Sequence, residues 1–239
     1  MPYLLDYMAT HVPKPACAVI GEPTEMQVVT AHKGMLSFET TVSGVEWHSS
    51  QPQRGVNAVH IAADLVHFIS TLAAELASGN VRDERFDPPH STAHVGVIRG
   101  GTARNIIPKQ CSFLWEIRAL PGDDGKTILA RFEDYCQSHP HAAHITTHCK
   151  TSVPGVTLPA GSETICQMVM HAAQTNQQHA VSFFTEGGEF QDHGIPSIIC
   201  GPGSIMQAHQ PNEFIGSGQI RECLAFLLRL TDDPTLTNH

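Results

Sequence analysis

Residues 34–42 read GMLSFETTV, a stretch in which apolar and polar side chains alternate. Because successive side chains of a strand point to opposite faces, this alternation predicts a strand with one buried and one solvated face. Apolar residues then recur at helical spacing over residues 58–76, up to Gly79. The pattern continues with a strand, a strand, a helix and a strand over residues 93–99, 111–119, 128–136 and 145–150. The order β-α-β-β-α-β predicts a four-stranded antiparallel sheet with two helices on one face.

Outside this segment, helices alternate with short apolar strands. Strands are expected at residues 17–20, 181–184 and 196–200. Residues 1–28 are expected to begin with a short amphipathic helix, and a further helix is expected at residues 163–175. The closing helix is expected to bury a face made of Ile220, Cys223, Leu224, Leu227 and Leu230. Such alternation indicates an α/β layer structure. The predicted fold class is therefore α/β, with one domain (residues 1–32 and 151–239) interrupted by another (residues 33–150).

Charge and cysteine usage exclude several classes of partner. The net charge is −9, the pI is about 5.9, and lysine and arginine do not cluster, so neither nucleic acid nor an anionic membrane surface is an expected partner. The seven cysteines are odd in number and form no Cys-x-x-Cys pair, which is typical of reduced thiols. The N-terminal residues lack the features of a signal peptide, and no apolar run is long enough for a membrane span. We expect a soluble cytoplasmic protein.

Two loops carry residues suited to metal binding. His209 lies in GPGSIMQAHQPNE, residues 201–213, directly after a predicted strand. A neutral imidazole held in such a Gly/Pro loop is a good zinc ligand. Glu22, in VIGEPT at residues 19–24, also follows an apolar strand-like run and offers a carboxylate. Together these residues indicate half of a metal site.

Several motifs occur in an order that resembles the M20 family of dinuclear metal-dependent amidohydrolases and peptidases. They are VIGEPT at 19–24, GVEWHSS at 44–50, RGVNA at 54–58, GGTARNIIP at 100–108, EIRALPG at 116–122 and the loop at 201–213. The resemblance covers essentially the whole chain and is strongest to the acetylornithine deacetylases, over desuccinylase, carboxypeptidase G-like and aminoacylase relatives. It implies a partial catalytic α/β layer domain interrupted by a ferredoxin-like βαββαβ lid. It also implies a homodimer formed through the lid and an N-acyl amino acid as substrate.

The resemblance implies that Glu22 and His209 each bind one ion of a pair of Zn²⁺ or Co²⁺ ions. In the family, the two ions share a bridging carboxylate and activate one water. The alternative for Glu22 is a surface carboxylate before Pro23. The alternative for His209 is a loop histidine hydrogen-bonded to the backbone.

The remaining implied site residues contact the substrate. His48 is implied to reach from the lid of one subunit into the active site of the other and to stabilise the oxyanion, or else it is an exposed histidine bonded to a neighbouring serine. Arg118 is implied to bind the substrate carboxylate with both arms of its guanidinium, and Asn105 to donate from the partner's lid. The alternative for both is a structural hydrogen bond. Glu186 is expected near a cationic side chain such as an ornithine ammonium, or else it is a carboxylate at a helix N-terminus.

Family members carry a further N-terminal region with a His-x-Asp pair, a bridging Asp, and a Glu-Glu pair that includes the general base. This chain begins with a segment that resembles the one just after that region. The resemblance therefore implies a truncated chain that lacks most of the metal ligands and is inactive alone. Two alternatives remain: a non-catalytic fragment that dimerises through its lid, and a related M20 deacylase or peptidase. The lid, residues 33–150, is expected to be more stable than the flanking parts. Without the N-terminal region, the apolar strands of the flanking parts would be exposed to solvent.

Overall fold

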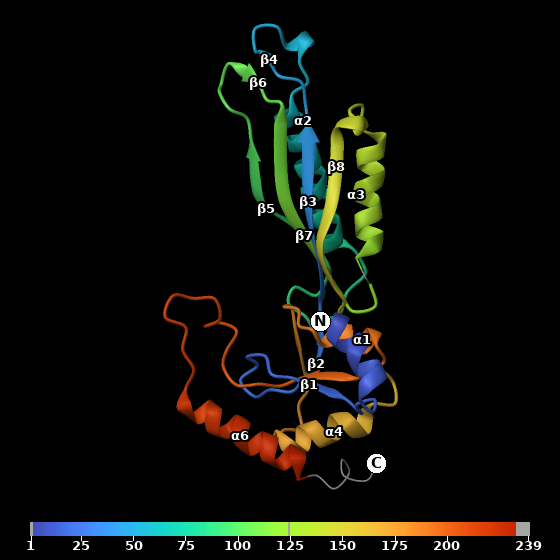
Figure 1. Cartoon of the computed structure of the whole chain (residues 1–239), viewed down its shortest axis with the longest axis vertical. Coiled ribbons are helices and arrows are strands. Elements are labelled where there is room, and N and C mark those ends of the chain that lie inside the picture. Colours follow the sequence, from blue (N-terminus) through green and yellow to red (C-terminus); the bar gives the residue numbers. More distant parts are fainter. Residues whose placement is uncertain (1, 124, 233–239) are drawn as a thin grey trace. The chain divides into compact units, whose positions relative to one another are not determined.

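The computed structural model describes residues 2–123 and 125–232 of the chain. These residues form two compact units (Figure 1). Unit 1 comprises residues 1–33 and 153–239, and unit 2 comprises residues 34–152, so the second unit is inserted into the first. The fold class is mixed α/β, as the sequence predicts.

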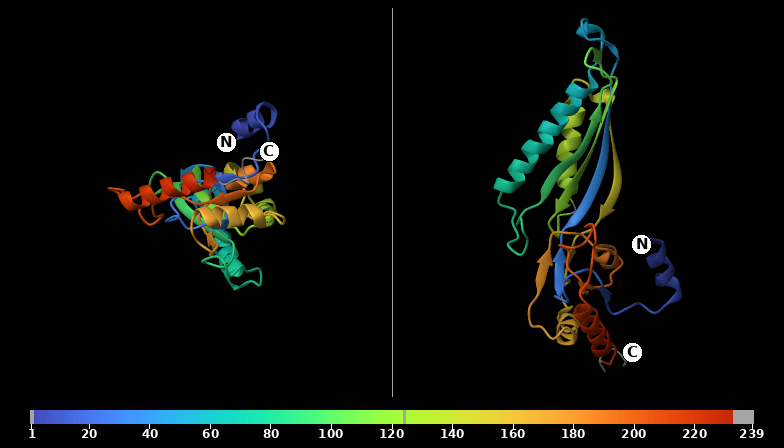
Figure 2. Two further views of the ribbon diagram at one scale, coloured as in Figure 1. Left: turned by 90° about the horizontal axis from the view of Figure 1, so that it is seen from below. Right: turned by 90° about the vertical axis from the view of Figure 1, so that its left-hand side faces the viewer.

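Unit 2 has the expected βαββαβ order. Its main elements are β3 (Gly34–Ser43), α2 (Ala58–Ser78), β5 (Thr92–Gly100), β7 (Gln110–Ala119), α3 (Lys126–Ser138) and β8 (Ile145–Val153). The strands form one sheet in the order β5-β7-β3-β8, and β7 runs antiparallel to both β3 and β5. Both helices lie on the same face of this sheet (Figure 2). This arrangement confirms the ferredoxin-like prediction.

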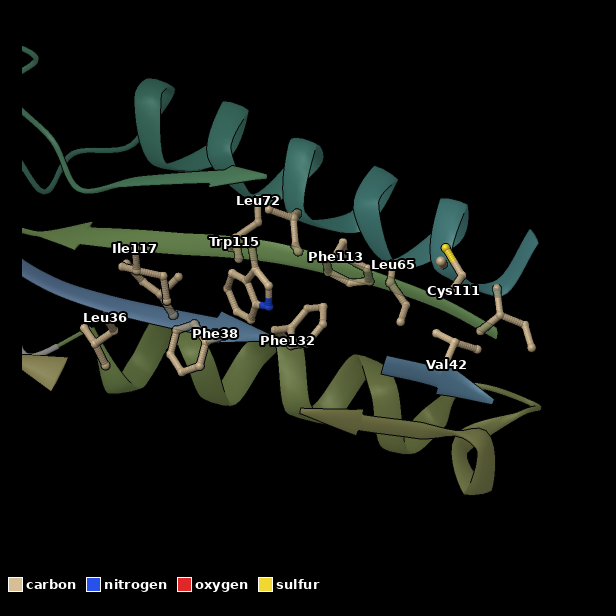
Figure 3. Packing of buried hydrophobic residues seen from close by; sticks show 14 of the residues in the cluster. Leu36, Phe38, Val42, Leu65, Leu72, Cys111, Phe113, Trp115, Ile117 and Phe132 are labelled. Atoms are coloured by element: carbon tan, nitrogen blue, oxygen red, sulfur yellow. The ribbon is translucent and has the colours of Figure 1, made fainter. Parts of the chain in front are cut away.

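The core of unit 2 fills the space between this sheet and its two helices (Figure 3). Alternate residues of β3, including Phe38 and Val42, point into it, as the 34–42 pattern predicts. The Trp115 ring lies against the rings of Phe38 and Phe132, with centroid distances of 4.5 Å to each. Its indole N–H donates to the Thr40 hydroxyl at 3.0 Å. Burial of such large rings contributes about 1.5–3 kcal/mol each.

Helix α2 begins at a side-chain cap and is amphipathic. The Asn57 side chain accepts hydrogen bonds from the amides of Val59 and His60, at 3.0 and 3.1 Å, which satisfies two of the unpaired donors of the first turn. Within the described residues, α2 is the single helix long and apolar enough to cross a membrane by length and composition. One face of α2 packs on the sheet of unit 2, which is the behaviour of a core helix.

A small ribbon lies at one end of unit 2. It pairs β4 (Trp47–His48) with β6 (Ile106–Ile107) in antiparallel fashion, and the one-turn helix η1 (Pro52–Arg54) follows β4. A second one-turn helix, η2 (Ala142–His144), precedes β8. The ribbon was not expected from the sequence because two-residue strands have no detectable periodicity.

Unit 1 combines a sheet of short strands with four helices among its described residues. In chain order the elements are α1 (Pro2–His11), β1 (Ala18–Ile20), β2 (Val29–His32), β9 (Val156–Thr157), α4 (Glu163–Ala172), β10 (His179–Val181), α5 (Gly187–Asp192), β11 (Ser197–Ile199) and α6 (Ser217–Thr231). The sheet order is β1-β11-β2-β10, with β9 paired to β2. Strands β1 and β11 are parallel neighbours, so their carboxyl ends lie at the same sheet edge.

Two local predictions in unit 1 were wrong, and two elements were missed. The strand expected at 181–184 lies at 179–181, where it pairs with β2, a strand that the sequence reading missed. Helix α5 was also missed, because six residues are too few for a helical pattern. Helix α6 buries Phe226 with Cys223 and Leu230 against it, whereas the expected core residues Ile220, Leu224 and Leu227 are exposed.

Candidate metal and substrate site

The two predicted metal-ligand loops are joined in unit 1. Glu22 follows β1 and the 201–213 loop follows β11, so both loops leave the same edge of the sheet. Ligand sites of α/β sheets form at this kind of edge, outside the carboxyl ends of the strands. The amides of Thr24 and Met26 donate to the Gly201 carbonyl at 3.2 and 2.9 Å, and the Glu25 amide donates to the Gly203 carbonyl at 2.8 Å. The backbone therefore fixes the Glu22 loop against the His209 loop.

Gly201 permits this close approach. A Cβ atom at position 201 would lie 2.5 Å from the Glu22 carbonyl oxygen and from the Gly21 carbonyl carbon, distances that real Cβ atoms do not show. The buried Thr24 side chain adds a further tie, because its hydroxyl accepts from the Gly201 amide at 3.1 Å and donates to the Gln27 carbonyl at 2.8 Å. Any larger residue at 201 would push the two loops apart.

Glu22 and His209 interact electrostatically. Burial raises the pKa of the Glu22 carboxyl, the Glu186 carboxylate raises it further, and His209 lowers it. His209 itself is exposed and has a left-handed backbone, with φ of 60°. Its amide donates to the Glu213 carboxylate at 3.1 Å. A non-glycine residue in this conformation costs about 1–3 kcal/mol, and such residues gather at ligand-binding sites.

Glu186 is held by a buried network that the sequence reading missed. The His32 ring is fully buried; its Nδ1–H donates to the Lys33 carbonyl at 2.8 Å, so Nε2 is the acceptor. Nε2 accepts from the Thr185 amide at 3.3 Å and from the Thr185 hydroxyl at 3.0 Å. The Gly187 amide in turn donates to that hydroxyl at 3.0 Å. This network fixes the turn from which the exposed Glu186 side chain extends.

Burial lowers the pKa of His32, and the hydrogen bond to the Lys33 carbonyl opposes that shift. The neutral ring required by the network is therefore the favoured form.

Glycine is required at position 188, next to this turn, because a Cβ atom there would lie 2.1 Å from the Pro154 carbonyl oxygen. An apolar-polar pattern gives no sign of such a network, because His32 and Thr185 are 153 positions apart in the sequence.

The described donor set does not hold a metal ion by itself. Among residues 2–123 and 125–232, no group of three or more His, Cys, Asp and Glu side chains is placed to bind a cation. Zinc takes three or four protein ligands, so the predicted pair of Glu22 and His209 would provide only part of a coordination shell. A cavity of about 460 Å³ lies beside the two loops, lined by residues such as Pro23, Gly203 and Glu213.

His48 and Asn105 lie next to each other in unit 2. His48 pairs with Ile106 across the β4–β6 ribbon, and the Ser49 amide donates to the Asn105 carbonyl at 3.0 Å. The Ser50 amide donates to His48 Nδ1 at 3.2 Å, and the Ser50 hydroxyl lies 2.7 Å from the same nitrogen. Since Nδ1 accepts, the ring proton is on Nε2. His48 thus presents an N–H donor from the exposed strand β4.

Arg118 lies near the opposite end of β7. Its Nε and one terminal nitrogen donate to the two oxygens of the Glu116 carboxylate, at 3.0 and 3.1 Å. This is the two-armed geometry that a substrate carboxylate would use. From Gln110, where β7 leaves the ribbon, to Arg118 the strand extends about 27 Å. Arg118 is therefore far from His48 and Asn105 within one chain.

Comparison with known proteins agrees with this fold. Residues 30–144 match the M20 peptidase dimerisation domain. The acetylornithine deacetylase of Myxococcus xanthus is 33% identical over 215 residues, covering 89% of this chain and 56% of that protein. The acetylornithine deacetylase of Buchnera aphidicola subsp. Acyrthosiphon pisum (strain Tuc7) is 34% identical over 214 residues, covering 88% and 55%. The crystal structure of a tripeptidase from Staphylococcus aureus superposes with a TM-score of 0.74 at 19% identity, covering 95% of this chain and 59% of that one.

Residues 30–144 thus carry the dimerisation domain of M20 peptidases, and most of the chain is similar in sequence to M20 hydrolases. Its relatives in sequence are acetylornithine deacetylases, and the tripeptidase shares its fold. The chain spans just over half the length of these relatives.

Proposed function

We propose that the chain supplies the lid and part of the catalytic unit of a cytoplasmic amidohydrolase that converts N2-acetyl-L-ornithine and water to L-ornithine and acetate, a step of arginine biosynthesis. The identity to acetylornithine deacetylases supports this substrate. The observation that carries the proposal is the backbone link between the Glu22 and His209 loops, which holds the two implied ligands at one sheet edge.

In this proposal, Glu22 and His209 each contribute to one ion of a pair of Zn²⁺ or Co²⁺ ions. Glu186, whose charge already acts on Glu22, is the counter-charge for the ornithine ammonium. The described residues lack a three-donor group, so the isolated chain is expected to be inactive.

The two ends of unit 2 act in different subunits of a homodimer. An acetylated ornithine is about 10 Å long, much shorter than the stretch of about 27 Å between the ribbon and Arg118. Arg118 and His48 can therefore contact the same substrate only if they come from different chains. The dimerisation domain supports this assembly. Arg118 would exchange Glu116 for the substrate carboxylate, and the His48 Nε2–H would stabilise the oxyanion of the tetrahedral intermediate.

A chimera tests this function. The matched 215 residues of the Myxococcus xanthus deacetylase are replaced by this chain, and hydrolysis of N2-acetyl-L-ornithine is measured with zinc. We expect turnover, and His48→Ala should lower kcat by about 100- to 1000-fold. A folded, zinc-loaded chimera that hydrolyses other N-acyl amino acids or dipeptides instead would assign the chain to a related M20 deacylase or peptidase.

The second candidate function is non-catalytic dimerisation, favoured by the lack of a three-donor group within the part of the chain that the structure describes. The isolated chain assayed with zinc separates the two. Turnover that is abolished by His209→Ala would contradict the inactivity of the isolated chain. A zinc-loaded chimera that dimerises and yet hydrolyses none of these substrates would favour the dimerisation function.

A further inference from the structure

Four of the seven cysteines gather in one core cluster of unit 1. Cys166 and Cys200 are buried members of this cluster, and Cys17 and Cys223 pack against it. Strands β1 and β11 run parallel, and Cys17 precedes the first whereas Cys200 follows the second. These two cysteines therefore lie at opposite ends of the strand pair, about 13 Å apart.

Cys223 is directed toward Cys200 by its neighbours on α6. Gln219 lies one turn before Cys223 on the same side of the helix, and its side chain accepts a hydrogen bond from the Gly203 amide at 2.5 Å. Gly203 in turn lies three residues after Cys200. Phe226, almost one turn after Cys223, is buried in the same cluster as Cys200. The inner face of α6 thus carries Cys223 to the end of β11 at which Cys200 lies.

The electrostatics of the two thiols agree with this placement. Burial raises the pKa of the Cys200 thiol to about 12, with smaller contributions from the Cys223 thiol and from Glu222. Because such interactions weaken with distance, the contribution of Cys223 requires the two thiols to be near each other. The Cys200 thiol is buried and donates to the Met26 carbonyl at 3.4 Å, whereas Cys223 is only partly buried. Cys223 is therefore the thiol that a small oxidant reaches first.

We propose that Cys200 and Cys223 form a reversible disulfide on exposure to hydrogen peroxide, and that this bond holds α6 against the end of β11. Peroxide first oxidises Cys223 to a sulfenic acid: an S–O bond forms, the O–O bond breaks and one water leaves. The Cys200 sulfur then attacks the Cys223 sulfur: the S–S bond forms, the S–O bond breaks, and the hydroxyl leaves as a second water with the Cys200 proton. The two thiols lose two hydrogens in total, and one hydrogen peroxide is reduced to two waters.

The disulfide closes a loop that contains residues 201–216, which join β11 to α6. A disulfide stabilises a fold mainly by restricting the unfolded state of the loop that it closes. Oxidation is therefore expected to suppress local opening of residues 201–216. Disulfide formation requires neither turnover nor a bound metal, so it is independent of the proposed function.

Peptide mapping of the full chain after treatment with hydrogen peroxide tests the proposal. Remaining thiols are blocked with N-ethylmaleimide under denaturing conditions, and the chain is then cleaved after glutamate. This cleavage places the four cysteines of the cluster on separate peptides, because glutamates lie at positions 22, 163, 186, 189, 213 and 222. The mass of the denatured, unreduced monomer distinguishes a link within one chain from a link between two chains.

We expect the monomer to lose two hydrogens, with residues 190–213 linked to the peptide that begins at Cys223. Dithiothreitol should reverse this change. Thermolysin cleavage within residues 201–216 should slow by roughly 10-fold or more in the oxidised chain. The map of the unmodified chain decides the pairing without any variant.

Three variants test the role of each thiol. Cys200→Ala should leave Cys223 as a sulfenic acid that dimedone captures, whereas Cys223→Ser should leave the Cys200 thiol unoxidised. Cys166→Ser, at a buried cysteine of the same cluster, is the control and should form the link in equal yield. Circular dichroism of each reduced variant checks its fold.

Three results would overturn the proposal. The first is a link that joins Cys200 or Cys223 to Cys17 or Cys166 instead. The second is retention of both thiols under peroxide treatment that oxidises Cys149, which is exposed. The third is a Cys200–Cys223 link that leaves thermolysin cleavage unchanged, because α6 would then not be held by the bond.

Discussion

The two units bury their apolar residues in different ways. Unit 2 has a single continuous core in which Phe38, Phe113, Trp115 and Phe132 fill the space under two long helices. The described part of unit 1 has two separate clusters, and Phe226 is the one aromatic residue among their fully buried members. Unit 1 also leaves a second apolar face of α6 exposed. Unit 2 thus has one continuous core, whereas the described part of unit 1 divides its core between two clusters.

Limited proteolysis gives the largest contrast expected from this difference. Cleavage should fall first in residues 2–33 and 153–232, because local unfolding is easiest where few apolar contacts hold the backbone. A fragment close to residues 34–152 should persist, as identified by mass spectrometry. Digestion of that fragment while the flanking parts remain intact would refute the comparison.

Truncation of the unit 2 core should be the most costly single change. Phe132→Ala removes a fully buried ring and should lower the free energy of unfolding of unit 2 by about 3–5 kcal/mol. Both tryptophans, Trp47 and Trp115, lie in unit 2, so tryptophan fluorescence during urea unfolding reports on this unit. Leu228→Ala, on the exposed face of α6, is the matched control. It should leave the urea midpoint of the fluorescence transition unchanged.

The loop junction of unit 1 should be sensitive to one methyl group. Gly201→Ala places a Cβ against the backbone of Gly21 and Glu22 and should cost about 1–3 kcal/mol. The adjacent thiol of Cys200 is buried, and its pKa is raised to about 12, chiefly by burial. Because Gly201→Ala disturbs the packing next to Cys200, alkylation of the Cys200 thiol should be faster in this variant. Gly216→Ala, where no atom lies within 4 Å, should react like the unmodified chain, and equal rates for both variants would contradict the close-approach argument.

The His32 network predicts a pH-dependent stability of unit 1. Thr185→Val removes the hydroxyl that joins His32 to Gly187 and should cost about 1–2 kcal/mol, whereas Thr185→Ser should cost less. Because the folded-state pKa of His32 is lowered, its stabilising contribution is present above about pH 6.5 and is lost as the pH falls. Alkylation of Cys166, buried in the same unit, measured at several pH values checks this trend. A His32→Phe variant with an unchanged pH profile would contradict it.

The smallest expected effect is a gain in stability. The pKa of Glu22 is raised by burial and by Glu186, so its charged form destabilises unit 1, and the loss grows as the pH rises through the folded-state value. Glu22→Gln should stabilise unit 1 at neutral pH by roughly 0.5 kcal/mol, after allowance for solvent screening. Glu25→Gln, at an exposed carboxylate, is the control and should leave the free energy of unfolding unchanged. A destabilised Glu22→Gln variant would show that the carboxylate has a structural role.

Local sequence patterns were sufficient to predict the architecture of unit 2, and the sequence motifs were sufficient to indicate a resemblance to the M20 family. Alternation over residues 34–42 and helical spacing over 58–76 are long enough to specify both the elements and their buried faces. The same reasoning located β1, β11 and α4 in unit 1 but missed β2 and α5 and misassigned the buried face of α6. Strands of two to four residues carry no period, and α6 has apolar residues on two sides.

The grouping of the candidate site residues depends on the three-dimensional fold and could not be predicted from local patterns. Parallel pairing of β1 and β11 brings Glu22 and the His209 loop to one edge across a long separation in the sequence. Strand β7 instead keeps Arg118 away from His48, and buried His32 fixes the turn before Glu186. Distances of this kind depend on strand pairing and close backbone approach, which are long-range contacts that local sequence patterns do not contain.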